Sequence, residues 1–173
     1  MRTDGDTGPK PSGTAFDSGV VVVDVRQQDL LVDEGRWAGL MRRVMAEEQV
    51  AAPWEAGLVF VPADEMAAVN AARRGIDRPT DVLALGVDDG CALRARDEPR
   101  LVGDVVICAK VAEANAKARN RAVDDEIALL VVHGTLHLLG YDHADDFDAE
   151  KMEHREQELL ALSSASSSPA GSQ

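Results

Sequence analysis

The segment from residue 123 to residue 143 places the strongest constraint on the fold. It reads VDDEIALLVVHGTLHLLGYDH and holds three of the four histidines in the chain. Its apolar residues recur at helical spacing: Ile127, Leu130, Val131 and Leu138. This pattern predicts a long, mostly buried helix over residues 123–139. His133 and His137 lie four residues apart, so both imidazoles project from one face of that helix.

The residues after this helix predict a third histidine at the same place. Gly140 can adopt the left-handed conformation that ends a helix, and the GYDH turn then brings His143 back toward His133 and His137. Three neutral imidazoles on one ion leave a fourth position open, which is the arrangement of catalytic zinc. Nickel, copper and iron also accept three imidazoles. We therefore predict one metal ion per chain, zinc, at the end of a central helix.

The same spacing occurs in the metzincin proteases, which makes a zinc metallopeptidase the second hypothesis. Those enzymes have a general-base glutamate directly after the first histidine, whereas this chain has Gly134. Asp142 is the nearest acidic residue that could replace that base. Zinc lowers the pKa of a bound water to about 7, so a hydrolase without the glutamate remains chemically reasonable.

Hydrophobic patterns along the rest of the chain predict an α+β fold. We expect strands over residues 20–27, 57–61, 81–85 and 103–109. We expect helices over residues 33–50, 64–73 with Asp64 as the cap, from the fourth strand to about 121, 123–139 and 144–162. This order predicts a single domain over residues 19–162, with a mixed four-stranded sheet packed against helices. Residues 1–18 and the Ser-rich residues 163–173 are expected to be disordered.

Composition and charge restrict the partners. The chain has no apolar run near the roughly 20 residues of a membrane helix and no signal-like start, so we expect a cytoplasmic protein without a membrane partner. A net charge of −13 argues against DNA or other bulk nucleic-acid binding through a broad basic surface. Residues 70–121 nevertheless hold ten basic and eight acidic side chains, which leaves room for a local positive face. Cys91 and Cys108 are expected to be reduced thiols, and the oligomeric state stays open.

The sequence VVHGTLHLLGYDH resembles the signature of the YbeY family, which are bacterial metal-dependent endoribonucleases of ribosomal RNA maturation and ribosome quality control. The similarity extends through VNAARRGIDRPTDVLAL, LVGDVVICA and MEHREQELL, over roughly residues 20–162. The resemblance implies His133, His137 and His143 as zinc ligands and Arg74 as an active-site arginine. It also implies single-stranded RNA as substrate, at the 3′ end of small-subunit ribosomal RNA, and the ribosomal small subunit as partner. A non-catalytic, ribosome-associated zinc protein is the third hypothesis.

We also expect specific roles for several residues around the predicted metal site. Arg74 can stabilise the charge of a phosphodiester transition state through two parallel hydrogen bonds, and Arg73 can assist. We expect Thr80 and Asp81 to position a strand, and Glu126 either to orient a metal ligand or to lie on a solvated helix face. Where the family usually reads T-D-V-L-S-F-P, this chain departs in the last three places: Ala84, Leu85 and Gly86.

Overall fold

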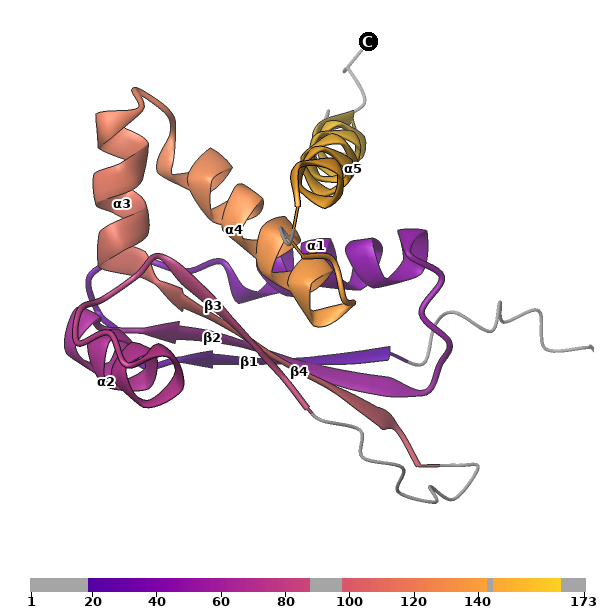
Figure 1. The fold of residues 1–173 in the computed structure, drawn as a ribbon, viewed down its shortest axis with the longest axis horizontal. Coiled ribbons are helices and arrows are strands. Elements are labelled where there is room, and N and C mark those ends of the chain that lie inside the picture. The colour runs from indigo at the N-terminus through magenta and orange to yellow at the C-terminus, as the bar shows by residue number, and fades with distance from the viewer. Residues whose placement is uncertain (1–18, 88–97, 143–144, 166–173) are drawn as a thin grey trace, which may run out of the picture.

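The computed structural model describes residues 19–87, 98–142 and 145–165 (Figure 1). The expected disordered segments therefore lie outside the described residues, apart from the first residues of the C-terminal tail. Nine elements follow one another along these ranges: β1 (Gly19–Val25), α1 (Glu34–Glu47), β2 (Trp54–Val61), α2 (Ala63–Arg74), β3 (Val82–Gly86), β4 (Arg100–Cys108), α3 (Ala109–Ala118), α4 (Val123–Leu138) and α5 (Asp146–Ala165).

The four strands form one mixed sheet, as the sequence predicts, in the order β1-β2-β4-β3. β1, β2 and β4 run parallel, and β3 pairs antiparallel with β4. Val82 lies opposite Ile107, and Gly86 lies opposite Gly103. The single α+β domain with a four-stranded mixed sheet is thus confirmed.

Helices cover the two faces of this sheet unequally. Alternate residues of β4 point to opposite faces, so Val105 and Ile107 pack with α1 and α4, while Val106 and Cys108 pack with α2. Figure 1 shows α2 on one side of the sheet and α1, α4 and α5 on the other. The larger core cluster lies on the α4 side, where α4 is enclosed between the sheet and α5.

Several predicted boundaries differ from the structure by one to three residues; β4, for example, begins at Arg100 instead of residue 103. Three of the differences have a physical reason. α2 begins at Ala63 with extended Pro62 as its cap, so Asp64 is not the cap; it lies in the first turn, where its carboxylate meets the positive end of the helix dipole. β2 begins at Trp54, three residues before the predicted start, because the alternation of buried residues already starts there. α5 continues to Ala165, past the predicted end at residue 162.

The extension of α5 has a packing reason. Leu159 is buried and Leu160 packs against the same core, so the last turn of the helix is attached to the domain. The Ser163 hydroxyl then donates a hydrogen bond to the Leu160 carbonyl at 2.7 Å, which stays within the helix.

Among the described residues, none of the helices combines the length and apolarity needed to span a membrane.

Candidate metal centre

His133 and His137 face each other on α4. Their Nε2 atoms are 3.2 Å apart, and the two rings meet at 74° with centroids 4.7 Å apart. A tetrahedral zinc ion with Zn–N bonds of about 2.0–2.1 Å would separate two ligand nitrogens by roughly 3.3 Å. The observed separation therefore fits two ligands of one zinc ion, and the structure brings together these two predicted residues.

The other nitrogen of His133 is held by a carboxylate from α5. His133 Nδ1 lies 2.9 Å from Glu156 Oε2, and both side chains are largely buried, at 29% and 14% exposure. A carboxylate on Nδ1 fixes the ring orientation and leaves Nε2 with its lone pair toward a metal. The sequence did not identify Glu156, because α5 is rich in acidic residues and nothing in their order singles out the one that reaches the histidine.

The third predicted ligand, His143, lies outside the described residues. Within residues 19–87, 98–142 and 145–165, no group of three or more His, Cys, Asp or Glu side chains is close enough to hold a metal. The described residues therefore supply two of the three expected imidazoles. The three-histidine site remains a proposal that rests on His133, His137 and the position of His143 directly after the turn.

A cluster of polar residues fixes the elements around the histidines. Glu48, the residue after α1, accepts hydrogen bonds from the Tyr141 hydroxyl at 2.9 Å and from Arg155 Nε at 2.6 Å. Arg155 also bonds Glu158 at 2.8 Å, and these two carboxylates raise its pKa. Burial and the bond to Glu48 raise the pKa of Tyr141, which keeps its hydroxyl a donor. We call Glu48, Tyr141 and Arg155 the Glu48 clamp; it links α1, the turn after α4, and α5.

Gly134 lies against the sheet rather than against the histidine rings. A Cβ atom at this position would lie 2.5 Å from Val105 Cγ1 and 3.3 Å from Val82 Cγ2. The glycine therefore allows α4 to approach β3 and β4 closely. Any side chain at residue 134 would enter the sheet, so the position that holds the protease base has no room for one here.

Arg74 lies on a different element from the two histidines. It ends α2, where Gly75 caps the helix in the left-handed conformation, and α2 lies on the sheet face opposite α4. Arg74 is exposed and lines a cavity of about 370 Å³ whose lining contains no histidine. The same cavity is lined by Thr80, Asp81 and Asn115. Arg73, also exposed, precedes Arg74 in the last turn of α2.

Thr80 and Asp81 hold the start of β3, as expected. Asp81 Oδ1 accepts from the Val82 amide at 2.8 Å and from the Thr80 hydroxyl at 3.2 Å. Asp81 Oδ2 accepts from Asn115 of α3 at 3.0 Å. These contacts connect β3 to α3 and fix the edge of the Arg74 cavity.

The two expectations for Glu126 are both wrong. Its side chain is fully buried, and it forms ion pairs with Arg119 and Arg121 from the connection between α3 and α4. Seven residues of helix separate Glu126 from His133 by roughly 10 Å, which is too far for a direct hydrogen bond. Glu126 therefore anchors the start of α4 and does not orient a ligand.

The departure at residues 84–86 leaves the strand intact. Ala84 pairs with Val105 in the antiparallel ladder, and Leu85 pairs with Asp104. Since Leu83 and Leu85 belong to the α2 side of the sheet, Ala84 points to the α4 side, the side of the histidines. Ala84, which replaces the usual serine, therefore lies on the face of the sheet that faces the histidines, but it has no hydroxyl.

The sequence is similar to proteins described as Endoribonuclease YbeY. A family model with that description matches residues 22–163. A relative from Pelotomaculum thermopropionicum is 38% identical over 144 residues, 81% of this chain and 94% of that protein. One from Roseiflexus sp. is 43% identical over 119 residues, covering 65% and 72% of the two chains. One from Salinispora tropica is 38% identical over 137 residues, covering 75% and 87%.

A solved structure shares the fold. The solution structure of TM1509 from Thermotoga maritima aligns with a TM-score of 0.56, at 22% identity, and covers 89% of this chain and 100% of that one. At this level of identity the match concerns the arrangement of the helices and strands.

Proposed function

Because the chain belongs to the Endoribonuclease YbeY family, we propose that it is a zinc-dependent endoribonuclease that hydrolyses phosphodiester bonds of single-stranded RNA. We place this activity in the cytoplasm, in maturation of the 3′ end of small-subunit ribosomal RNA and in ribosome quality control. The observation that supports it best is the pair of facing Nε2 atoms on α4, 3.2 Å apart, with Glu156 on the far side of the His133 ring.

The residues around this pair have distinct proposed roles. His133, His137 and His143 hold the ion, and Glu156 keeps the His133 ring in the ligating orientation. When bound, zinc supplies Lewis-acid chemistry that makes water nucleophilic near neutral pH and stabilises charge on a phosphate oxygen. This chemistry needs no glutamate at position 134, where the sheet leaves no space for one.

Arg74 has a proposed role in binding the RNA strand. Arg74 is exposed at the end of α2, in a cavity whose lining contains no histidine, which supports contact with a phosphate away from the cleaved bond. An arginine suits this role because its planar group can form two parallel hydrogen bonds with one phosphate. We propose that Arg74 positions the strand across the edge of the sheet.

Substrate preference separates the three hypotheses. Purified protein is incubated with end-labelled single-stranded RNA, with the same RNA as a duplex, and with casein, each with and without a metal chelator. We expect cleavage of the single strand, little cleavage of the duplex, an intact casein, and loss of cleavage with the chelator. Casein hydrolysis would support the metallopeptidase, and a metal-containing protein that cuts neither substrate would support the non-catalytic protein.

A further inference from the structure

The cavity lined by Arg74 combines two arginines with three neutral polar side chains. Its volume of about 370 Å³ is within the roughly 300–1,000 Å³ range of ligand sites. These five residues come from α2, from the connection between α2 and β3, and from α3: Asn70, Arg74, Arg78, Thr80 and Asn115. The proposed function uses only Arg74 of this set, so the ligand that the whole set fits has still to be assigned.

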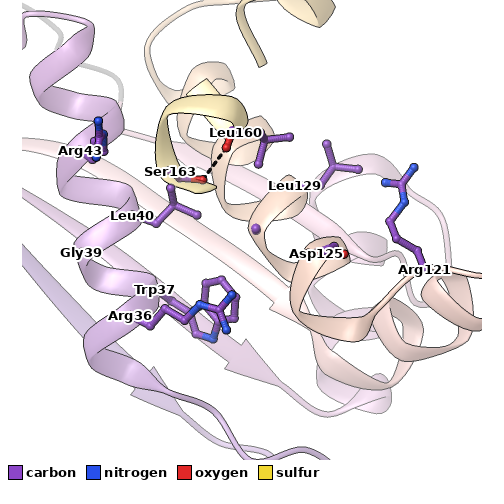
Figure 2. Close-up of a pocket in the computed structure, with 11 residues that line it drawn as sticks. Arg36, Trp37, Gly39, Leu40, Arg43, Arg121, Asp125, Leu129, Leu160 and Ser163 are labelled. Atoms are coloured by element: carbon purple, nitrogen blue, oxygen red, sulfur yellow. Dashed lines mark hydrogen bonds between the residues drawn. The ribbon is translucent and has the colours of Figure 1, made fainter. Parts of the chain in front are cut away.

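Both arginines of this cavity are open to a ligand. Arg74 and Arg78 are exposed, and within the part of the chain that the structure describes neither side chain forms an ion pair or a hydrogen bond. The groove between α1, α4 and α5 (Figure 2) differs in this respect, because its Arg36 is paired with Asp124 of the same chain. The Arg74 cavity therefore offers two unpaired guanidinium groups to an anion.

One carboxylate in the cavity wall does not cancel this charge. Of the described residues that line the cavity, only Asp81 is acidic. Its two oxygens accept three hydrogen bonds, from the Val82 amide, the Thr80 hydroxyl and the Asn115 amide. Two guanidinium groups outnumber one carboxylate, so the cavity is positive in a chain whose net charge is −13. Arginine forms two parallel hydrogen bonds with a phosphate, which makes a phosphate the anion that fits best.

The neutral side chains of the cavity have used their donors and kept their acceptors. Asn70 Nδ2 donates to the Arg78 carbonyl at 2.8 Å, and Asn115 Nδ2 donates to Asp81 Oδ2 at 3.0 Å. Because a carbonyl and a carboxylate can only accept, these contacts fix which amide atom is the nitrogen. The Thr80 hydroxyl likewise donates to Asp81. The oxygens of these three side chains therefore suit a ligand that donates hydrogen bonds.

Asn70 gives the strongest indication of such a ligand. The residue is 3% exposed, and its Oδ1 atom has no hydrogen-bond partner among the described residues. Buried polar atoms are nearly always paired, because an unpaired one destabilises the folded state. Asn70 belongs to the wall of the same cavity as the two open arginines. A ligand that joins a phosphate to a hydrogen-bond donor would satisfy both.

A ribonucleotide has this combination of groups. In RNA each phosphate adjoins a ribose whose 2′-hydroxyl can donate a hydrogen bond, and DNA lacks that hydroxyl. In the proposed hydrolysis water attacks the phosphate, so the 2′-hydroxyl is not needed for the reaction itself. Phosphate contacts do not distinguish the two nucleic acids either. Selectivity for RNA then has to come from a contact with the sugar.

We propose that the Arg74 cavity holds one ribonucleotide of the substrate strand and distinguishes RNA from DNA. Arg74 and Arg78 bind the phosphate. The 2′-hydroxyl donates to Asn70 Oδ1, with Asn115 Oδ1 as the neighbouring acceptor, and Ile76, 40% exposed, provides an apolar surface for the ribose. This inference rests on the proposed function, since it takes single-stranded RNA as the substrate.

The test compares two labelled oligonucleotides that differ only in the 2′-hydroxyl. Oligo(U) RNA and oligo(dU) DNA of the same length carry the same base, and uracil has no exocyclic amino group that could donate to the asparagines. Their affinities for the full, zinc-loaded chain are measured by fluorescence anisotropy at low temperature, with a gel to confirm that the RNA stays intact. We expect the RNA to bind about tenfold more tightly, the size of effect that one hydrogen bond to a buried group can give.

Four variants separate sugar recognition from charge and from folding. Asn70→Ala should bring the RNA-to-DNA affinity ratio close to one, and Asn115→Ala should lower it at least about threefold, both without weakening DNA. Arg78→Ala should weaken RNA and DNA equally, because both have the phosphate. Gln28→Ala removes an exposed amide outside the cavity and should change neither affinity. Circular dichroism melts identify a variant that fails to fold; if Asn70→Ala does, the partly exposed Asn115 decides.

Four results would overturn the inference. The first is equal affinity of the parent chain for the two oligonucleotides, and the second is a full RNA preference in both folded asparagine variants. The third is an equal loss of RNA and DNA binding in those variants, which would make the asparagines structural. The fourth is a preference for oligo(C) over oligo(U) that Asn70→Ala abolishes, which would assign the acceptors to the base.

These results can be told apart from a failure of the proposed function. Chelator-sensitive RNA cleavage by a chain that binds RNA and DNA equally would overturn only the role of the cavity. A clear RNA preference in binding by a chain that does not cleave would overturn only the proposed ribonuclease activity.

Discussion

At the scale of single residues, the hydrogen bond between Glu156 and His133 Nδ1 determines how the first proposed ligand is presented. A carboxylate accepts this hydrogen bond more strongly than an amide does. Glu156→Gln should therefore lower zinc affinity roughly 10- to 100-fold, as loss of such partners does at other metal sites. Zinc affinity is measured by competition with a chromophoric chelator. Glu150→Gln, an exposed change on the same helix, is the control; an equal loss in both variants would contradict the assigned role.

Arg74 tests where the RNA lies. Arg74→Ala should raise KM for single-stranded RNA by about tenfold or more with little change in kcat, because its proposed contact with the strand is away from the cleaved bond. Arg73→Ala, the neighbouring exposed arginine, should have a smaller effect. A fall in kcat of about 100-fold at unchanged KM would instead place Arg74 at the reacting phosphate, as for a group that stabilises transition-state charge.

The substitution of glycine by alanine is expected to destabilise the protein at Gly134 and to stabilise it at Gly39. Gly134→Ala forces a Cβ to within 2.5 Å of Val105, and overpacking of this kind costs about 1–3 kcal/mol. Gly39, within α1, has open space around its Cβ position, so Gly39→Ala should stabilise the protein by up to about 1 kcal/mol. Urea denaturation measures both. A Gly134→Ala protein as stable as the parent would show that α4 does not pack on the sheet this closely.

At the scale of elements, the Glu48 clamp determines how α5 lies over α4. Glu48→Ala removes the acceptor shared by Tyr141 and Arg155, so α5 and its Glu156 should lose their fixed position. We expect a lower melting temperature and about tenfold weaker zinc binding. Glu47→Ala is the matched control, because the Glu47 side chain is exposed and only its backbone carbonyl bonds Arg155. Normal zinc affinity in a folded Glu48→Ala protein would separate the clamp from the metal centre.

The helices and strands that were predicted well are those whose hydrophobic periodicity can be seen in their own residues. In α4 apolar residues recur at helical spacing, and in the strands apolar and polar residues alternate. Both patterns show which positions are buried, so they can be recognised from neighbouring residues alone. The His133–His137 pair follows from the same helix period. The predicted end of α5 was early because Leu160 and Ser163 are held by contacts with the fold and by a local bond, which composition alone does not show.

Contacts between elements could not be predicted in this way. Glu156 reaches His133 across 23 positions of sequence, and Glu48 reaches Arg155 across 107. The sequence predicts that Glu126 either orients a ligand or lies on a solvated face, yet its side chain is buried and pairs with two arginines from the preceding connection. The packing of α2 on the sheet face opposite α4 likewise depends on how α2 crosses the sheet, which has no signature in the residues themselves.

At the scale of the whole molecule, the sheet separates the α2 side, which carries the Arg74 cavity, from two surfaces on the α4 side. The proposed metal centre lies between α4 and α5, the Arg74 cavity lies by α2 on the opposite face, and the groove of Figure 2 lies between α1, α4 and α5. A net charge of −13 opposes RNA binding over most of the surface, so binding has to be concentrated where arginines gather. Under the proposed function, we expect cleavage of strands that reach both Arg74 and the metal centre.

The dependence of RNA cleavage on bound zinc tests the central claim most directly. Chelator-stripped protein is titrated with zinc while cleavage of labelled single-stranded RNA and bound zinc are followed together, in the parent chain and in His137→Ala. We expect cleavage to be restored in proportion to zinc and to level off at about one ion per chain, with neither tight binding nor cleavage in His137→Ala. Full cleavage by the stripped protein, or by His137→Ala, would contradict a reaction centred on the histidines of α4.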